Sequence, residues 1–283
     1  MLMPTSIRHT FYSIIQHLSL DVTLGSICSA SFVVHLLGIK MPLSWWVILP
    51  LSVWLIYTAD HLLDAFRLKD QAHTPRHLFH YTYFPSILGV WITGSLLALV
   101  CTYFLPFSII QFGCIMAGLT VLHLSLVTII GNKVSWLLHK ELGVGFIYSA
   151  GVWGGPMMMF PMKIQAPIFL LFAQFFLLAM INLFIFSIYE YDTDEQDGHT
   201  SFIRAIGLSN AKIGVGIFAV LHIGLGILSL YLSAFFPYQL ILHMMLLLLI
   251  LTLTCDKWFG QKERYRLWGD AAFLLPVLIW LWN

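Results

Sequence analysis

Long apolar runs make up most of this chain, and they restrict its fold more than any other feature. About 20 consecutive, mostly apolar residues are enough for a helix to cross a bilayer. Of the 283 residues, 59% are hydrophobic and 10% are charged, whereas a soluble domain has about 25% charged residues. The sequence therefore predicts an all-α integral membrane protein with nine transmembrane helices. The predicted spans are 18–39, 42–64, 84–105, 107–130, 142–162, 164–189, 208–233, 236–255 and 267–283.

The basic residues between these runs predict how the chain is oriented. With a cytoplasmic N-terminus, 12 of the 14 Lys and Arg residues fall on the cytoplasmic side, and only Lys40 and Lys163 lie opposite. This asymmetry is the one that the positive-inside rule describes. We therefore expect the C-terminus on the opposite side, and residues 1–283 to form one polytopic membrane domain that begins with a short interfacial segment, 1–17. The expected location is a bacterial inner membrane.

Seven of the 13 acidic residues gather in two segments, 57–64 and 189–198, which close the second and sixth runs at the cytoplasmic side. A carboxylate at bilayer depth costs about 2.5–3.5 kcal/mol on insertion scales, so such a residue is usually paired or functional. Each segment has two acids four residues apart, which share one helix face and repel one another unless a cation lies between them. Mg²⁺ is the expected cation, because it takes carboxylate oxygens and completes its shell with substrate phosphate. The predicted catalytic and metal-binding acids are Asp60, Asp64, Glu190 and Asp194, with Asp197 as a further metal ligand.

Basic residues lie on the same side as the two acidic segments. Carboxylates that hold a metal, with Arg and Lys beside them, are typical of a diphosphate site. The apolar interior next to such a site would take a lipid tail. The predicted diphosphate-binding residues are Arg67, Arg76, Lys140 and Arg204.

The two acidic segments resemble the motifs of the UbiA superfamily of intramembrane prenyltransferases. That family has nine helices and two Asp-rich motifs, at the cytoplasmic ends of helices two and six. Its first motif, N-D-x-x-D-x-x-x-D, resembles residues 56–64, where Ile56 and Tyr57 replace the Asn and the first Asp. Its second motif, D-x-x-x-D-x-x-x-G-x-x-T, is similar to the series that this chain carries as Glu190, Asp194, Gly198 and Ser201.

The resemblance implies a Mg²⁺-dependent enzyme with its active site at the cytoplasmic mouth of a central membrane cavity. It would transfer a prenyl or polyprenyl chain from a prenyl diphosphate to an acceptor, which in the family is usually an aromatic ring. The expected partners are this donor, the acceptor and membrane lipids. The net charge of +1 is too small for nonspecific electrostatic binding of nucleic acid by the protein as a whole. The altered first motif leaves an alternative open: a non-catalytic UbiA-like membrane protein, either a lipid or ion carrier or an inactive relative.

Several other residues have simpler interpretations. We expect Asp21 and Asp270 to pair with a nearby Lys or Arg, and Asn182 to join helices. The glycines and the proline of residues 151–156 predict an irregular fifth span. The basic segment 257–266 is interpreted as an interfacial loop for anionic lipid headgroups. The four histidines near the first acidic segment match no zinc pattern, and we interpret them as polar loop residues.

Overall fold

A computed structural model describes residues 11–71, 74–130, 138–196, 202–233 and 235–282, and every regular element in this part is helical. Seven of these helices are long and apolar enough to cross a membrane. They are α2 (Leu20–Leu37), α3 (Leu43–Leu68), α5 (Phe84–Thr102), α6 (Phe107–Ile130), α8 (Ala166–Tyr189), α11 (Leu208–Leu232) and α12 (Phe236–Thr254). The prediction of an all-α multi-pass membrane protein is thus confirmed.

The other two predicted spans have a different form. The fifth is α7 (Leu138–Met159), and the ninth is α14 (Arg264–Ala272) followed by the 3-10 helix η4 (Leu275–Leu281). Neither is among the seven, so the count of nine and the orientation of the termini stay predictions. Residues 151–156 lie within the unbroken helix α7, so the expected irregularity of this span is wrong.

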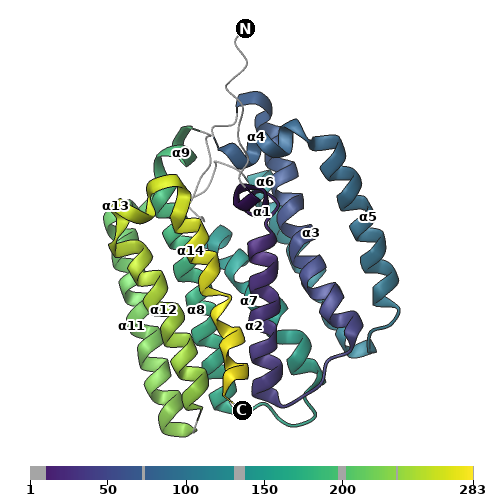
Figure 1. Ribbon diagram of the computed structural model, residues 1–283, viewed down its shortest axis with the longest axis vertical. Helices are drawn as coiled ribbons and strands as arrows, with labels where there is room; N and C mark the ends of the chain where they lie inside the picture. Colours follow the sequence, from purple (N-terminus) through teal and green to yellow (C-terminus); the bar gives the residue numbers. More distant parts are fainter. Residues whose placement is uncertain (1–10, 72–73, 131–137, 197–201, 234, 283) are drawn as a thin grey trace.

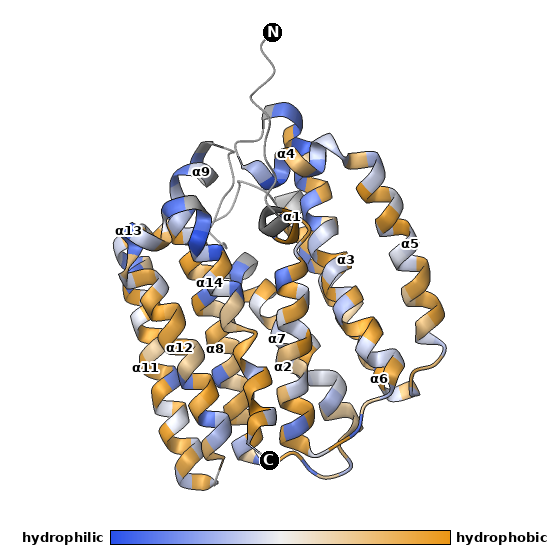
Figure 2. Ribbon diagram, in the orientation of Figure 1, coloured by the Kyte–Doolittle hydropathy of each residue, from blue (hydrophilic) through white to orange (hydrophobic). Residues whose placement is uncertain are grey.

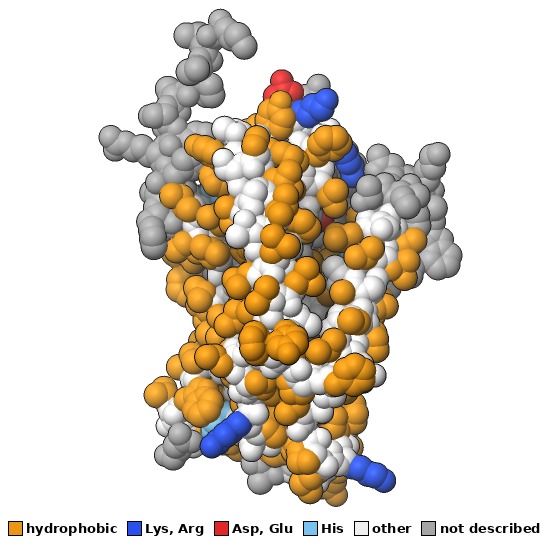
Figure 3. Space-filling model, turned by 90° about the vertical axis from the view of Figure 1, so that its right-hand side faces the viewer, with side chains coloured by type: hydrophobic (Ala, Val, Ile, Leu, Met, Phe, Trp, Pro, Cys, Tyr) orange, Lys and Arg blue, Asp and Glu red, His pale blue; other side chains and the backbone are white. Residues whose placement is uncertain are grey.

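The long helices stand side by side and form a bundle with two unlike ends (Figure 1). The short elements gather at one end, which we call the polar end, and this is where hydrophilic residues are concentrated (Figure 2). Between the ends, the face in Figure 3 is largely hydrophobic, as expected of a surface in contact with lipid. The short elements are α1 (Phe11–His17), η1 (Lys69–Gln71), α4 (Pro75–Thr82), α9 (Tyr191–Gln196), α10 (Phe202–Ile206), α13 (Asp256–Phe259) and η3 (Gln261–Glu263).

Helix α8 forms the centre of the bundle. It contacts α7, α11, α12 and α14, and its buried side chains include Leu171, Phe175 and Ile181. A helix that is apolar on all sides gains most when neighbours surround it completely. This buried helix ends at Tyr189 with Glu190 as its C-cap, so the second acidic segment starts at the polar end of the most enclosed helix.

Candidate functional site

A cavity of about 250 Å³ opens at the polar end, and we call it the polar cavity. Residues of α1, α3, α4, α7, α8, α9, η3 and α14 line it. Its charged lining residues are Asp60, Asp64, Arg76, Glu141, Glu190, Glu263 and Arg266. The two predicted acidic segments therefore face one shared cavity, although about 130 residues of chain separate them.

Asp60 and Asp64 enter the polar cavity from the last turns of α3. Their four-residue spacing places both carboxylates on the same face of the helix, one turn apart. The His77 imidazole contacts the second of these acids, with its Nε2 3.6 Å from Oδ2 of Asp64. The predicted pairing of these two acids on one face is thus found.

Glu190 is held by two neighbouring residues of α14. Its Oε1 forms an ion pair with Nη2 of Arg266 and accepts a hydrogen bond of 3.0 Å from the Tyr265 hydroxyl. The Tyr265 ring stacks on Tyr189 at 4.4 Å between centroids, and the Arg266 guanidinium lies 5.3 Å from the Phe186 ring centroid. Glu190 is therefore fixed by both charge and packing.

The electrostatics of α14 follow from this arrangement. Burial opposes the charge on Arg266, but the Glu190 carboxylate outweighs burial and raises the pKa of Arg266. Burial and then the same carboxylate raise the pKa of Tyr265 above its usual range. Arg266 is thus a permanent cation in the wall of the polar cavity, and Tyr265 is a neutral hydrogen-bond donor.

Arg76 brings a second guanidinium to the polar cavity. It follows Pro75 at the start of α4, where proline is well tolerated because the first N–H has no partner within the helix. Its Nη1 lies 3.3 Å from Nε2 of His61, and no carboxylate of the described residues lies within ion-pair distance of it. Burial and the nearby Arg266 lower the pKa of Arg76, and the carboxylates of Glu190, Asp21 and Asp270 act in the opposite direction.

The remaining predicted site residues lie elsewhere or are not described. Arg67 is exposed, and neither it nor Arg204 is among the described residues that line the polar cavity. Arg204 instead pairs with Glu195 at 3.2 Å. The side chains of Lys140 and Asp194 lie outside the described part of the structure, and so does the whole of Asp197. The roles predicted for these residues stay predictions.

Arg266 is a charged residue of the polar cavity that the sequence interpretation missed. The sequence assigned it to an interfacial loop for lipid headgroups, and that assignment is wrong for this residue, because its side chain turns into the bundle and pairs with Glu190. The reason is that α13 and η3 turn the chain back over the polar end before α14 enters the core. The signal available in the sequence was its position directly before the ninth apolar run, 267–283.

The donor set of the polar cavity can be tested against Mg²⁺. Among the described residues, no group of three or more metal-binding side chains is already assembled. Mg²⁺ commonly binds through one or two carboxylates and takes its other ligands from water and substrate phosphates. Asp60 and Asp64 together supply two carboxylates for this mode. Glu190 forms an ion pair with Arg266.

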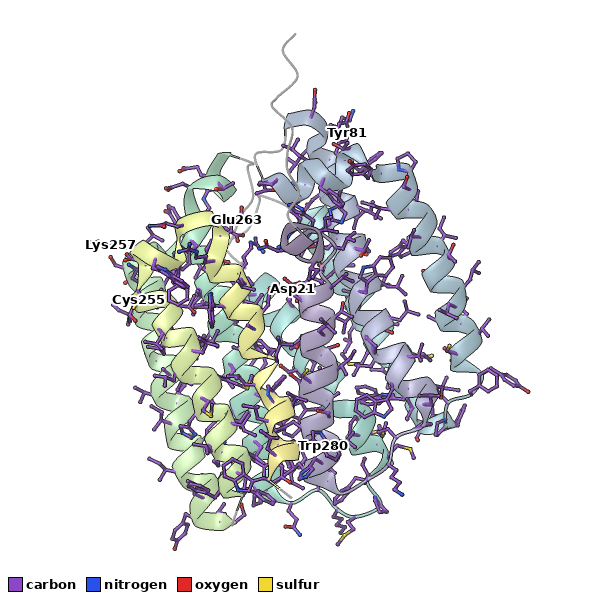
Figure 4. All side chains as sticks on the ribbon, in the orientation of Figure 1. Asp21, Tyr81, Cys255, Lys257, Glu263 and Trp280 are labelled. Atoms are coloured by element: carbon purple, nitrogen blue, oxygen red, sulfur yellow. The ribbon has the colours of Figure 1, made fainter. Side chains whose placement is uncertain are left out.

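A second, smaller space of about 30 Å³ adjoins the polar cavity, and we call it the inner chamber. Val144 and Leu183 line both, so they form the boundary between the two. Its other lining residues are Val22, Tyr57, Gly145, Tyr148, Ala179, Asn182, Asp270 and Phe273. In Figure 4, Glu263 marks the polar end, and Asp21 lies further from that end.

Comparisons with known proteins show which solved structures have a similar fold. No family model and no curated protein matches the sequence. Among solved structures, a UbiA homologue from Aeropyrum pernix K1 has a TM-score of 0.66 and 14% identity, and the match covers 92% of this chain and 98% of that one. A UbiA homologue from Archaeoglobus fulgidus, bound to DMAPP and Mg²⁺, has a TM-score of 0.64 and 12% identity, over 94% and 98% of the two chains.

A third structure, of a digeranylgeranylglyceryl phosphate synthase, has a TM-score of 0.56 and 14% identity, over 94% and 96% of the two chains. All three likenesses extend over nearly the whole of both chains. The resemblance predicted from two short acidic segments is thus confirmed by the arrangement of the helices. This chain has the fold of the UbiA superfamily of intramembrane prenyltransferases.

Proposed function

We propose that this protein transfers a prenyl group from a prenyl diphosphate to an acceptor at the polar cavity. The observation that carries the proposal is the convergence of two carboxylates of α3 with two arginines from α4 and α14 at one end of an apolar bundle. A prenyl diphosphate has the matching form, since its head is strongly anionic and its tail is apolar. A solved structure with the same fold holds DMAPP and Mg²⁺, which supports this class of donor.

In this proposal, the carboxylates bind the metal and the basic residues bind the diphosphate. Asp60 and Asp64 would hold Mg²⁺, with Asp194 and Asp197 as further predicted ligands. The metal supplies a positive charge that neutralises the departing diphosphate. Arg76 and Arg266 bind the diphosphate oxygens, because guanidinium groups match phosphate in charge and geometry. Lys140, Arg67 and Arg204 stay predicted contributors to the same task.

The transfer itself breaks one bond and makes another. The C–O bond between the prenyl carbon and the diphosphate breaks, and the diphosphate leaves with the electron pair. The electron-deficient allylic carbon then bonds to the acceptor, which gives up a proton. Aromatic faces near the reacting carbon stabilise its positive charge, and Tyr57, Tyr148 and Phe273 of the inner chamber are candidates.

The loop charges support an orientation with the polar end at the cytoplasmic face. The membrane that we propose is a bacterial inner membrane. A donor made in the cytosol would then reach the polar cavity directly. The second candidate function is a non-catalytic carrier of lipids or ions. It is favoured by one observation, that Glu190 already has a protein cation, Arg266, as its partner.

The test compares binding of dimethylallyl diphosphate (DMAPP) by the purified protein and by the Asp60→Asn variant, with and without Mg²⁺. We expect Mg²⁺ to strengthen binding to the wild type and the variant to lose about tenfold or more in Mg²⁺-dependent affinity, because one metal ligand is neutralised. Asp192→Asn is the matched control, since Asp192 is an exposed acid outside the polar cavity. A wild type that binds no DMAPP with Mg²⁺, or an Asp60→Asn variant that binds it equally well, would refute the proposal.

A further inference from the structure

A prenyl tail would find apolar surroundings in the inner chamber rather than in the polar cavity. Most described residues that line the polar cavity are polar or charged, and its aliphatic side chains are Pro75, Val144 and Leu183. Val144 and Leu183 also form the boundary with the inner chamber. A donor whose diphosphate contacts Arg76 and Arg266 would therefore direct its tail past this boundary into the chamber.

The two polar residues of the chamber wall, Asp270 and Asn182, are partners of each other. Their side chains share a hydrogen bond. Asp270 and Asp21 were expected to pair with a Lys or Arg, but neither takes part in an ion pair in the described part of the chain. The other lining residues are aliphatic, aromatic or glycine, so the chamber is suited to an apolar group.

Three aromatic rings close the inner chamber on the side away from the polar cavity, and we call them the aromatic floor. Tyr148 and Phe273 line the chamber, and both rings contact Phe175. The three ring centroids lie 5.6–6.1 Å from one another, within the range of aromatic contact. On α7, Tyr148 follows Val144 by four residues, so the aromatic floor lies about one helical turn below the boundary.

The bundle is tightly packed below and beside the aromatic floor. The Trp153 ring is 0% exposed and contacts Phe175 at 6.0 Å, and Phe32 of α2 lies 6.3 Å beyond it. On the side of α2, a Cβ atom added at Gly25 would lie 3.1 Å from the Cβ of Phe273. An interior packed in this way leaves no space for a chain to continue past the rings.

The volume of the chamber matches the end of a short tail. A water molecule needs about 10–15 Å³ in such a cavity, so the chamber of about 30 Å³ has room for about two or three groups of that size. The two methyl groups at the end of a dimethylallyl chain are of this size. A second isoprene unit would have to displace Tyr148 or Phe273, and overpacking of a filled core is unfavourable.

We infer that the donor carries a single isoprene unit and that the aromatic floor sets this limit. Phe273 is the residue most directly responsible, because its ring lines the chamber and contacts both other rings of the floor. This inference rests on the proposed function, and it adds the length of the donor's tail.

The experiment compares DMAPP with geranyl diphosphate, which has the same head and one more isoprene unit. Unreactive S-thiolo analogues of both displace labelled DMAPP from the purified full chain in detergent with Mg²⁺. Free ligand concentrations are measured, so that uptake of the longer tail by micelles does not alter the comparison. We expect the wild type to prefer the dimethylallyl compound by about tenfold or more. Burial of apolar surface alone would favour the longer tail, so this order reports the closed floor.

Phe273→Ala opens the floor. We expect the preference to fall to about threefold or less, because the missing ring leaves a cavity that the second isoprene unit can fill. Phe273→Leu removes less volume and should give an intermediate preference. Phe184→Ala is the matched control, since Phe184 is also buried, at 1% exposed, but packs against Gly214 of α11. It should keep the preference of the wild type.

The DMAPP affinity reports separately on folding and on the proposed function. A wild type that binds neither diphosphate refutes the proposed function and this inference with it. A wild type that binds the geranyl compound as tightly as the dimethylallyl compound overturns the inference alone. A preference that both Phe273 variants leave intact has the same consequence.

Discussion

The ion pair between Glu190 and Arg266 changes the interpretation of the second acidic segment. The first acid of that segment faces a guanidinium and a tyrosine hydroxyl of α14, so a protein cation stands where a shared metal was expected. Arg266 has donors to spare, because a guanidinium carries five N–H groups. Under the proposed function, Glu190 would position Arg266 for the diphosphate.

Replacing Arg266 tests this role. We expect Arg266→Gln to weaken Mg²⁺-dependent DMAPP binding by about tenfold or more, because a charge-assisted hydrogen bond contributes about 1.5–3 kcal/mol. Arg266→Lys should recover part of the loss, since it keeps the charge but not the fork of donors. Binding is measured by equilibrium titration with labelled DMAPP.

Arg264→Gln is the matched control, since Arg264 lies two residues away over the Trp258 ring, at 4.5 Å, and does not line the polar cavity. The double variant Arg266→Gln/Glu190→Gln removes both charges of the pair. If the double variant regains wild-type affinity, Arg266 serves only to neutralise Glu190, and its assignment to the diphosphate is wrong.

The sequence could predict that two site residues lie together only where they are a few positions apart on the same helix. Asp60 and Asp64 could be found because four residues separate them on one helix, and the polar cavity contains both. The Glu190–Arg266 pair joins residues 76 positions apart, and no local pattern encodes such a contact. Arg76 was predicted from its place in the loop, whereas its neighbour His61 was assigned to a polar loop and is in fact buried on α3.

At the scale of the elements, glycines allow α7 to pack closely. Gly154 faces the Phe112 ring of α6, and Gly155 faces the indole of Trp45 of α3, which is 3% exposed. Each ring occupies the space that a Cβ atom would need. These glycines, with Pro156, predicted an irregular span, whereas α7 is one continuous helix in which Gly154 and Gly155 allow close packing.

Adding a methyl group at one of these glycines should destabilise the bundle. We expect Gly155→Ala to lower the unfolding free energy by about 1–3 kcal/mol, because the rigid, buried Trp45 ring must move. Gly151→Ala is the control on the same helix, since nothing lies within 4 Å of its added Cβ. Thermal unfolding in detergent checks both variants, and equal melting temperatures would contradict the packing argument.

Helix boundaries were less predictable than helix existence. The ninth apolar run reads as one span, but α14 ends at Ala272 and a 3-10 helix follows. Pro276 explains the break, because it has no N–H to donate to the carbonyl four residues earlier. A hydropathy pattern indicates how long and how apolar a run is, but it does not indicate that the N–H of Pro276 is missing.

At the scale of the whole molecule, the fold is shared with solved structures although the sequences differ widely. The helices are arranged as in two solved UbiA homologues and a digeranylgeranylglyceryl phosphate synthase, at 12–14% identity. Apolar runs and loop charge were enough to predict a polytopic bundle, because membrane insertion depends on those two properties. The lining of the inner chamber was not predictable, since it depends on five helices, α2, α3, α7, α8 and α14, meeting next to the polar cavity.

The most direct test of the central claim is a crystal structure of the protein with Mn²⁺ in place of Mg²⁺ and the unreactive analogue dimethylallyl S-thiolodiphosphate. The account predicts an anomalous peak about 2.0–2.3 Å from carboxylate oxygens of Asp60 or Asp64, a distance similar to that of other small divalent cations. It also predicts diphosphate density in contact with Arg76 and Arg266. An anomalous peak outside the polar cavity, or a diphosphate bound at the opposite end of the bundle, would contradict it.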